Sequence, residues 1–185
     1  MYPSEHITSS DIVFLGDSLT ESFDLKKHFD RNDLRNRGIS GDMTEHVLYR
    51  LEEIFNTRPA KLFLMIGIND IYQGLASDIV IGNIERILTE IQNNTPQTKI
   101  YCQSILPVNE DHLLSFENIN ARVYNANNSL RDLCKKKQIT FVDIHPDFLN
   151  DHGQMDEQYT YDGVHLTEHG YILWAELIKE LIDNF

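Results

Sequence analysis

The residues Gly16-Asp17-Ser18-Leu19-Thr20 place a serine hydroxyl directly after a short apolar run, Ile12-Val13-Phe14-Leu15. The run is typical of a buried strand, and the residues after Leu19 can continue as a helix. In open α/β sheets, ligands bind beside the carboxyl ends of the strands. Ser18 is therefore a candidate nucleophile, although a serine in this context is more often a helix cap.

Three further polar segments lie next to apolar runs or directly before the last helical pattern. Because parallel strands bring their carboxyl ends to one edge of a sheet, we expect all three segments beside Ser18. The segments are Asn36-Arg37-Gly38-Ile39-Ser40-Gly41-Asp42, Gly67-Ile68-Asn69-Asp70 and Tyr161-Asp162-Gly163-Val164-His165-Leu166-Thr167.

Together these segments supply the groups that serine catalysis needs. A serine hydroxyl is a weak nucleophile until a base takes its proton, and His165 can be that base. Asp162, three residues earlier, can accept from the His165 ring across a turn, fix the tautomer and stabilise the imidazolium. The Asn69 side chain and the backbone N–H groups of Gly41 and Ser18 can bind an oxyanion. Each segment alone is also typical of an ordinary turn, and it is their combination that favours catalysis.

The apolar runs alternate with helical patterns, which predicts a parallel sheet with helices on both faces. We expect strands at 12–15, 34–39, 61–66, 99–106 and 139–144. Asp42 and Glu45 resemble a capping box before apolar residues that recur at helical spacing up to Phe55. Ser77 is expected to cap a helix that ends near Asn94 and Pro96. Two later helices are expected at 116–136 and 167–182, the second with Trp174 in the core.

The segments resemble the sequence blocks of the SGNH superfamily, the GDSL-type esterases and lipases. Four blocks match in order across almost the whole chain, and one departure is Ile68, where Thr or Ala is common. The second block is also similar to the acetylhydrolase branch, which includes the platelet-activating-factor acetylhydrolase catalytic subunits and bacterial carbohydrate acetylesterases. The matching residues are Gly16-Asp17-Ser18-Leu19, Gly41, Gly67-Ile68-Asn69-Asp70 and Asp162-Gly163-Val164-His165.

The resemblance implies a three-layer α/β/α, flavodoxin-like fold whose five parallel strands have the order 2-1-3-4-5. It implies one hydrolase domain over residues 1–185, catalysis without a metal or cofactor, and a possible homodimer. The order of serine before Asp-x-x-His, and the lack of Gly-x-Ser-x-Gly, separate the chain from the α/β-hydrolases.

Composition limits the partners of the chain. Its 185 residues are 41% hydrophobic and 24% charged, which is typical of one globular domain. The net charge of −13 disfavours nucleic acid and anionic membrane surfaces as partners. No apolar stretch approaches the ~20 residues that span a bilayer, so we expect a soluble cytoplasmic protein without membrane insertion. Whether a signal peptide was removed before this numbering stays open.

We expect Cys102 and Cys134 to be buried free thiols rather than a disulfide.

Other polar and apolar positions near the expected site are weaker candidates. The segment from Asp143 to Asp156 holds carboxylates and imidazoles, but its spacing favours a polar loop over a metal site. Candidates for the substrate pocket are the neighbours of Ser18, the residues after the Asn69 block and the loop after the fourth strand. They are Asp17, Leu19, Ile71, Tyr72, Pro107 and Asn109.

The sequence therefore predicts a serine esterase that removes short acyl groups, acetyl above all, from a small-molecule O-ester. A thioesterase or lysophospholipase for longer acyl chains is the first alternative. A non-catalytic binding module on the same fold is the second. The sequence does not indicate the alcohol part of the ester.

Overall fold

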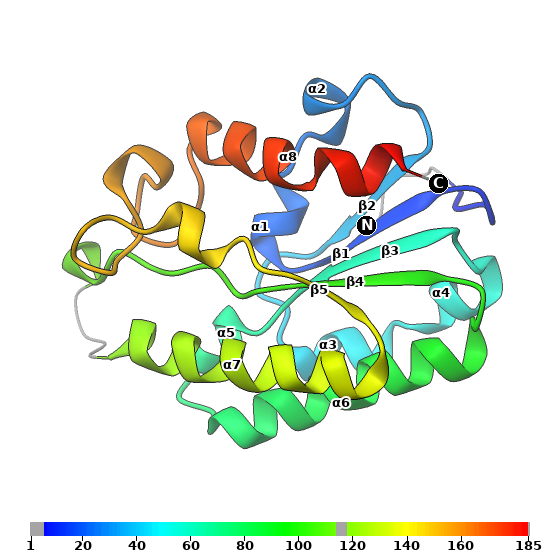
Figure 1. Cartoon of the computed structure of the whole chain (residues 1–185), viewed down its shortest axis with the longest axis horizontal. Coiled ribbons are helices and arrows are strands. Elements are labelled where there is room, and N and C mark those ends of the chain that lie inside the picture. The colour runs from blue at the N-terminus through cyan, green and yellow to red at the C-terminus, as the bar shows by residue number, and fades with distance from the viewer. Residues whose placement is uncertain (1–5, 114–117, 185) are drawn as a thin grey trace.

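Five parallel strands form the centre of the protein, which is described by a computed structural model over residues 6–113 and 118–184. The strand order is β2-β1-β3-β4-β5, which confirms the order that the resemblance implies. All five strands run the same way, so their carboxyl ends meet at one edge (Figure 1). The strands are β1 (Ile12–Gly16), β2 (Leu34–Gly38), β3 (Lys61–Met65), β4 (Lys99–Gln103) and β5 (Thr140–Val142).

Helices cover both faces of the sheet and complete the expected three layers (Figure 1). One layer contains α1 (Ser18–Glu21), α2 (Leu25–His28) and α8 (Glu168–Asp183). The other contains α3 (Thr44–Tyr49), α4 (Glu52–Thr57), α5 (Ile68–Tyr72), α6 (Ser77–Asn94) and α7 (Ile119–Lys137). Phe116, near the expected start of the third long helix, lies outside the described residues. Among the described residues, no helix has the length and apolar character to cross a membrane.

An aromatic ladder runs across the middle of the sheet. The rings of Phe14 and Phe63 stack at 4.9 Å between centroids, and those of Phe63 and Tyr101 stack at 4.6 Å. These three residues are register partners on adjacent strands, so the stacking fixes β1, β3 and β4 against one another. Trp174 of α8 is buried, as expected, and its indole N–H donates to the Gln103 side chain at 2.7 Å.

Two of the expected helix caps are wrong. The carboxylate of Asp42 binds Arg50 at 2.7 Å instead of capping α3, because a charged partner makes a stronger hydrogen bond than a backbone N–H. The cap position is Met43, whose N–H donates to the His46 side chain. The helical pattern also divides near Arg50 into α3 and α4. Ser77 is the first residue of α6 rather than its cap.

Both cysteines are buried and free, as the sequence predicts. Cys102 lies on β4, and Cys134 lies on α7. A hydrogen bond to Cys134 raises the pKa of the Cys102 thiol well above its usual value, and burial adds to this effect. These thiols are packing groups in the core.

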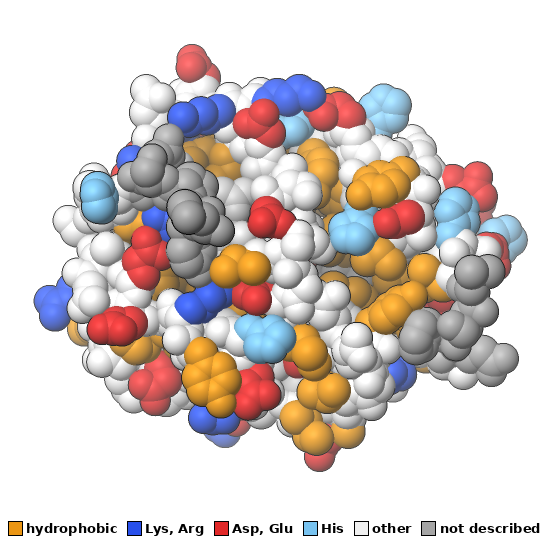
Figure 2. Space-filling model, turned by 180° about the vertical axis from the view of Figure 1, so that it is seen from behind, with side chains coloured by type: hydrophobic (Ala, Val, Ile, Leu, Met, Phe, Trp, Pro, Cys, Tyr) orange, Lys and Arg blue, Asp and Glu red, His pale blue; other side chains and the backbone are white. Residues whose placement is uncertain are grey.

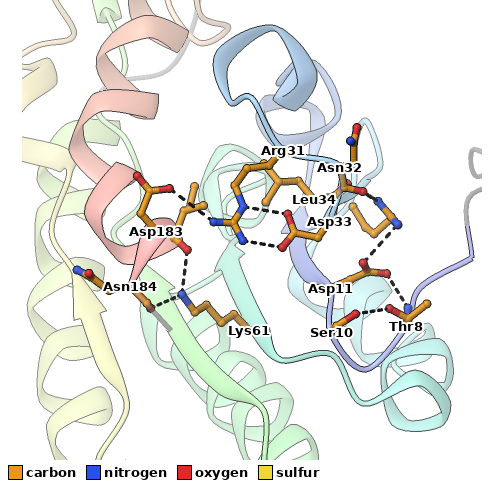
Figure 3. A network of polar contacts seen from close by, with 12 residues as sticks. Thr8, Ser10, Asp11, Arg31, Asn32, Asp33, Leu34, Lys61, Asp183 and Asn184 are labelled. Carbon is orange, nitrogen blue, oxygen red and sulfur yellow. Dashed lines mark hydrogen bonds and ion pairs between the residues drawn. The ribbon is translucent and has the colours of Figure 1, made fainter.

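The amino edge of the sheet is tied to the end of α8 by one buried lysine. The Lys61 ammonium donates to the backbone carbonyls of Leu181, Ile182 and Asn184 at 2.8, 3.0 and 2.6 Å. Figure 3 shows the bond to Asn184. The carbonyls at a helix end have no partner within the helix, and a cation there also stabilises the helix dipole. Lys61 therefore anchors α8 far from the carboxyl edge, where the candidate site lies.

Candidate active site

Ser18 is the first residue of a short helix that follows β1 directly. Asp17 is the N-cap of that helix, and its Oδ1 accepts from the Leu19 N–H at 3.0 Å. The sharp turn from strand to helix leaves Ser18 partly exposed at the carboxyl edge of the sheet. The position is the one that the sequence predicts for a nucleophile, and the residue that caps the helix is Asp17 rather than Ser18.

A chain of hydrogen bonds joins Ser18 to the distant Asp-x-x-His segment. Ser18 Oγ lies 3.0 Å from His165 Nε2, across 147 residues of sequence. On the other side of the ring, His165 Nδ1 donates to Asp162 Oδ2 at 2.6 Å. The His165 and Asp162 side chains are 36% and 41% exposed, so the ring can be reached from solvent. The structure thus brings the three predicted triad residues together.

The turn from Thr160 to Leu166 fixes the position of Asp162. Its Oδ1 accepts from the backbone N–H groups of Val164 and His165 at 2.9 and 2.7 Å. Gly163 has a positive φ of 94°, and a Cβ there would lie 2.7 Å from the Asn109 carbonyl oxygen. Only glycine fits this turn without strain, since L residues disfavour that backbone region and the space is filled.

The environment of Asp162 favours its charged form. Burial acts to raise the pKa of this carboxyl, but hydrogen bonds from the His165 ring and from the backbone outweigh it. The pKa of Asp162 is therefore below its usual value. An ionised Asp162 holds the proton of His165 on Nδ1 and leaves Nε2 free to accept from Ser18.

Two of the predicted oxyanion residues, Gly41 and Asn69, lie on a loop and on a short helix that contact each other. Asn69, in the first turn of α5, donates from Nδ2 to the Asp42 carbonyl at 2.9 Å, which places its side chain beside the segment that follows Gly41. The Asp70 carboxylate accepts from the Thr44 N–H at 3.0 Å and from its hydroxyl at 2.5 Å. Gly41 has a φ of 79°, and nothing lies within 4 Å of the position that a Cβ would occupy. A ligand can therefore approach the Gly41 backbone closely.

The loop that carries Gly41 is also fixed to the nucleophile side of the site. Arg50 binds the Asp42 carboxylate and donates to the Gly16 carbonyl at 2.9 Å. The Ser40 N–H donates to the Glu21 carboxylate of α1 at 3.1 Å. Arg50 and Glu21 were not predicted from the sequence. The available signal for Arg50 was an acid and a base eight residues apart, about two helical turns, at the two ends of α3.

Asp17 is the most perturbed carboxyl beside the site. It is completely buried, and its Oδ2 has no hydrogen-bond partner among the residues that the structure describes. Burial raises its pKa to about 7, against the lowering effects of the Leu19 N–H and the His165 ring. Asp17 therefore shapes the turn before Ser18 and does not face the opening of the site.

Most of the predicted pocket residues are part of the packed fold. Asn109 is buried, and its side chain donates to the Met155 carbonyl at 3.0 Å, so it supports the loops around Gly163. Its backbone N–H donates to the Gly163 carbonyl at 2.7 Å. Tyr72 is partly exposed and stays a pocket candidate. The others are buried because the segments after the strands fold back onto the core; they are Asp17, Leu19, Ile71 and Pro107.

Two residues of the acidic and histidine-rich segment after β5 bind groups of the surrounding fold. Its most buried histidine, His145, makes a hydrogen bond from Nδ1 to the Ile105 carbonyl at 2.9 Å, and burial lowers its pKa. Asp143 forms an ion pair with Arg131 of α7. These contacts agree with the prediction of a polar loop.

Comparisons with known proteins agree with this geometry. The model of the GDSL-like lipase/acylhydrolase family matches residues 14–173. The chain is 31% identical over 179 residues to "platelet-activating factor acetylhydrolase IB subunit alpha2" of Rattus norvegicus, covering 93% of this chain and 76% of that protein. The alpha1 subunit of Bos taurus is 30% identical over the same length, covering 93% and 75%.

Solved structures show the same fold. A GDSL-like lipase of Bacteroides thetaiotaomicron superposes with a TM-score of 0.85 at 26% identity, covering 95% of this chain and 88% of that one. An acetyl xylan esterase superposes with a TM-score of 0.78 at 21% identity, covering 93% and 99%. The family match over most of the chain and the similarity to both curated relatives lead to one conclusion: this chain belongs to the GDSL-like lipase/acylhydrolase family and is a carboxylic ester hydrolase.

Proposed function

We propose that the chain is a serine esterase that hydrolyses short-chain O-esters, acetyl esters above all, through an acyl-enzyme on Ser18. The observation that carries the proposal is the continuous relay from Ser18 Oγ to His165 at 3.0 Å and from His165 to Asp162 at 2.6 Å. These three groups, in this order, supply a nucleophile, a base and an orienting acid.

In the acylation step, Ser18 Oγ bonds to the ester carbonyl carbon while His165 Nε2 takes the hydroxyl proton. Asp162 stabilises the resulting imidazolium without taking its proton. When the tetrahedral intermediate collapses, the bond to the alcohol oxygen breaks and His165 gives its proton to that oxygen. Water then attacks the acyl-enzyme with His165 again as the base, which releases the acid and restores Ser18.

The oxyanion is proposed to lie between Ser18, Gly41 and Asn69. An asparagine amide has two N–H donors, and one of those on Asn69 is occupied by the Asp42 carbonyl. That bond orients the amide, so the second N–H and the backbone N–H groups of Ser18 and Gly41 are the proposed donors. Donors that are already oriented stabilise developing charge without further rearrangement.

Preference for short acyl groups is supported by two considerations. The curated relatives are named acetylhydrolases. A thioesterase or lysophospholipase for long chains needs an extended apolar groove, whereas Leu19 and Ile71, beside the predicted site residues, are packed in the core. The family membership and the intact relay argue against the second alternative, a non-catalytic binding module.

The test uses the p-nitrophenyl esters of acetate and decanoate, with wild type, Ser18→Ala and Ser10→Ala. Ser10 is an exposed serine at the amino edge of the sheet and serves as the matched control. We expect Ser18→Ala to lose nearly all turnover and all labelling by a fluorophosphonate, while Ser10→Ala keeps both. Faster turnover of decanoate than of acetate would favour the long-chain alternative. Unchanged turnover in Ser18→Ala would refute the serine mechanism.

A further inference from the structure

The loop that carries Gly41, residues 39–42, has one backbone amide without a hydrogen-bond partner among the residues that the structure describes. That amide is the N–H of Gly41, which is exposed, whereas the other three N–H groups of the loop each have an acceptor. The three bonds join Ile39 to the Gly16 carbonyl at 3.0 Å, Ser40 to the Glu21 carboxylate at 3.1 Å and Asp42 to the Ile39 carbonyl at 3.1 Å. The loop is therefore fixed around a single amide that a ligand can bind.

A shielded ion pair joins the end of this loop to the end of β1. Arg50 is the C-cap of α3; its Nε donates to the Asp42 carboxylate at 2.7 Å, and its Nη2 donates to the Gly16 carbonyl at 2.9 Å. Figure 2 shows acidic and basic side chains scattered over the face that it presents, and exposed ion pairs contribute little to stability. The Arg50 and Asp42 side chains are 15% and 10% exposed, so water and salt screen this pair far less.

The two oxygens that Arg50 binds lie beside two of the proposed oxyanion donors. Gly16 is the last residue of β1 and precedes Ser18 by two residues, and Asp42 directly follows Gly41. A guanidinium is planar and holds its N–H donors in a rigid fork. One rigid group therefore contacts both the strand end that leads to the Ser18 N–H and the loop that presents the Gly41 N–H.

We propose that Arg50 is a positioning residue for the oxyanion site, which holds the Gly41 N–H at the distance from Ser18 that the reaction requires. The inference rests on the proposed esterase function. Arg50 acts through the backbone that it binds rather than on the ester itself. Oxyanion donors are effective when they are aimed, before the reaction, at the point where charge develops. A displacement of about 1 Å caused by a distant change can lower a rate by about 10²-fold.

Loss of this positioning should lower kcat and leave KM unchanged. Acylation and deacylation each pass through a tetrahedral intermediate with a negatively charged oxygen, so a displaced Gly41 N–H slows both steps. When both steps slow by the same factor, kcat and kcat/KM fall together, which is the signature of an interaction made only in the transition state.

The experiment measures kcat and KM on p-nitrophenyl acetate, and the urea midpoint, for wild type, Arg50→Gln, Arg50→Lys and Ser18→Ala. Arg31→Gln is the matched control, because it removes a similar ion pair from the opposite edge of the sheet (Figure 3). Arg31 Nε donates to the Asp33 carboxylate at 2.9 Å, and its side chain is 23% exposed.

We expect Arg50→Gln to lower kcat by about 10- to 100-fold, with a KM within about twofold of wild type. A lysine carries the charge but lacks the fork, so Arg50→Lys should have a kcat between those of Arg50→Gln and wild type. Arg31→Gln should lower the urea midpoint while its kcat and KM match wild type.

Three results would overturn the inference and leave the esterase function intact. A kcat for Arg50→Gln within about twofold of wild type would show that Gly41 keeps its place without the guanidinium. A raised KM with an unchanged kcat would assign Arg50 to ground-state binding. A loss of kcat in Arg31→Gln as large as that in Arg50→Gln would reduce the effect to lost stability. If Ser18→Ala is as active as wild type, the proposed function itself fails, and the inference falls with it.

Discussion

Replacing Asp17 with asparagine should stabilise the protein more at alkaline than at acidic pH. The folded protein keeps Asp17 protonated up to a pKa of about 7, whereas the unfolded chain has the ordinary value of 3.8. Between these values the unfolded state releases the proton and the folded state does not. The contribution of Asp17 to stability is therefore fully present below pH 3.8, and it is lost as the pH rises to about 7.

The magnitude follows from the pH interval that is crossed. One pH unit corresponds to about 1.4 kcal/mol for a single proton, so the rise from about pH 5 to about pH 7 removes roughly 2–3 kcal/mol. The asparagine of the variant cannot ionise, and its side-chain oxygen can still accept from the Leu19 N–H that Asp17 now binds. The variant should therefore escape this loss.

Urea unfolding of wild type and Asp17→Asn at about pH 5 and about pH 8.5 measures the effect. Subtracting the free energies of unfolding of the two proteins at each pH removes the contribution of every titrating group that they share. We expect this difference to increase from about pH 5 to about pH 8.5 by roughly 2–3 kcal/mol in favour of Asp17→Asn. Asp33→Asn is the control, because the hydrogen bond from Arg31 lowers the pKa of Asp33 and its titration ends below this range. A difference that is equal at both pH values would refute the reasoning.

Three further substitutions test other parts of the structure. Asn69→Ala should lower kcat on acetate esters by roughly 10²–10³ with little change in the urea midpoint, and a loss below about tenfold would exclude Asn69 from the oxyanion site. Gly163→Ala should lower both stability, by about 1–3 kcal/mol, and kcat, because a Cβ meets the Asn109 carbonyl at 2.7 Å; unaltered thermal unfolding would contradict this. Lys61→Met should lower the free energy of unfolding by about 1–3 kcal/mol through three lost hydrogen bonds, while esterase rates below the melting range stay at the wild-type level.

The parallel sheet could be predicted because its strands are buried on both faces. Runs such as 12–15 and 61–66 are continuously apolar or nearly so, and a strand between two helical layers requires that pattern. The strand order came from the resemblance rather than from the pattern. The joining of Ser18 to His165 was likewise predictable, since both belong to segments that meet at the carboxyl edge.

Details that depend on competing tertiary partners were not predictable. Asp42 has a suitable type and position for a helix cap, but Arg50 lies close enough to take its carboxylate. Asp17 adjoins Ser18 and so resembles a pocket residue, yet the turn directs its side chain inwards. The exposure of a loop side chain depends on how the loop folds back onto the core. Residue type and spacing alone do not predict that path.

The anchoring of α8 by Lys61 has a consequence for the synthesis of the protein. His165 lies at the start of the segment that leads into α8, and 147 residues separate it from Ser18. At roughly 5–20 residues per second, the ribosome needs about 7–30 s to pass from one to the other. During that time the nascent chain carries the proposed nucleophile and oxyanion residues without the proposed base. The proposed relay can therefore assemble only after His165 has been synthesised, and α8, whose end Lys61 binds, follows that histidine in the chain.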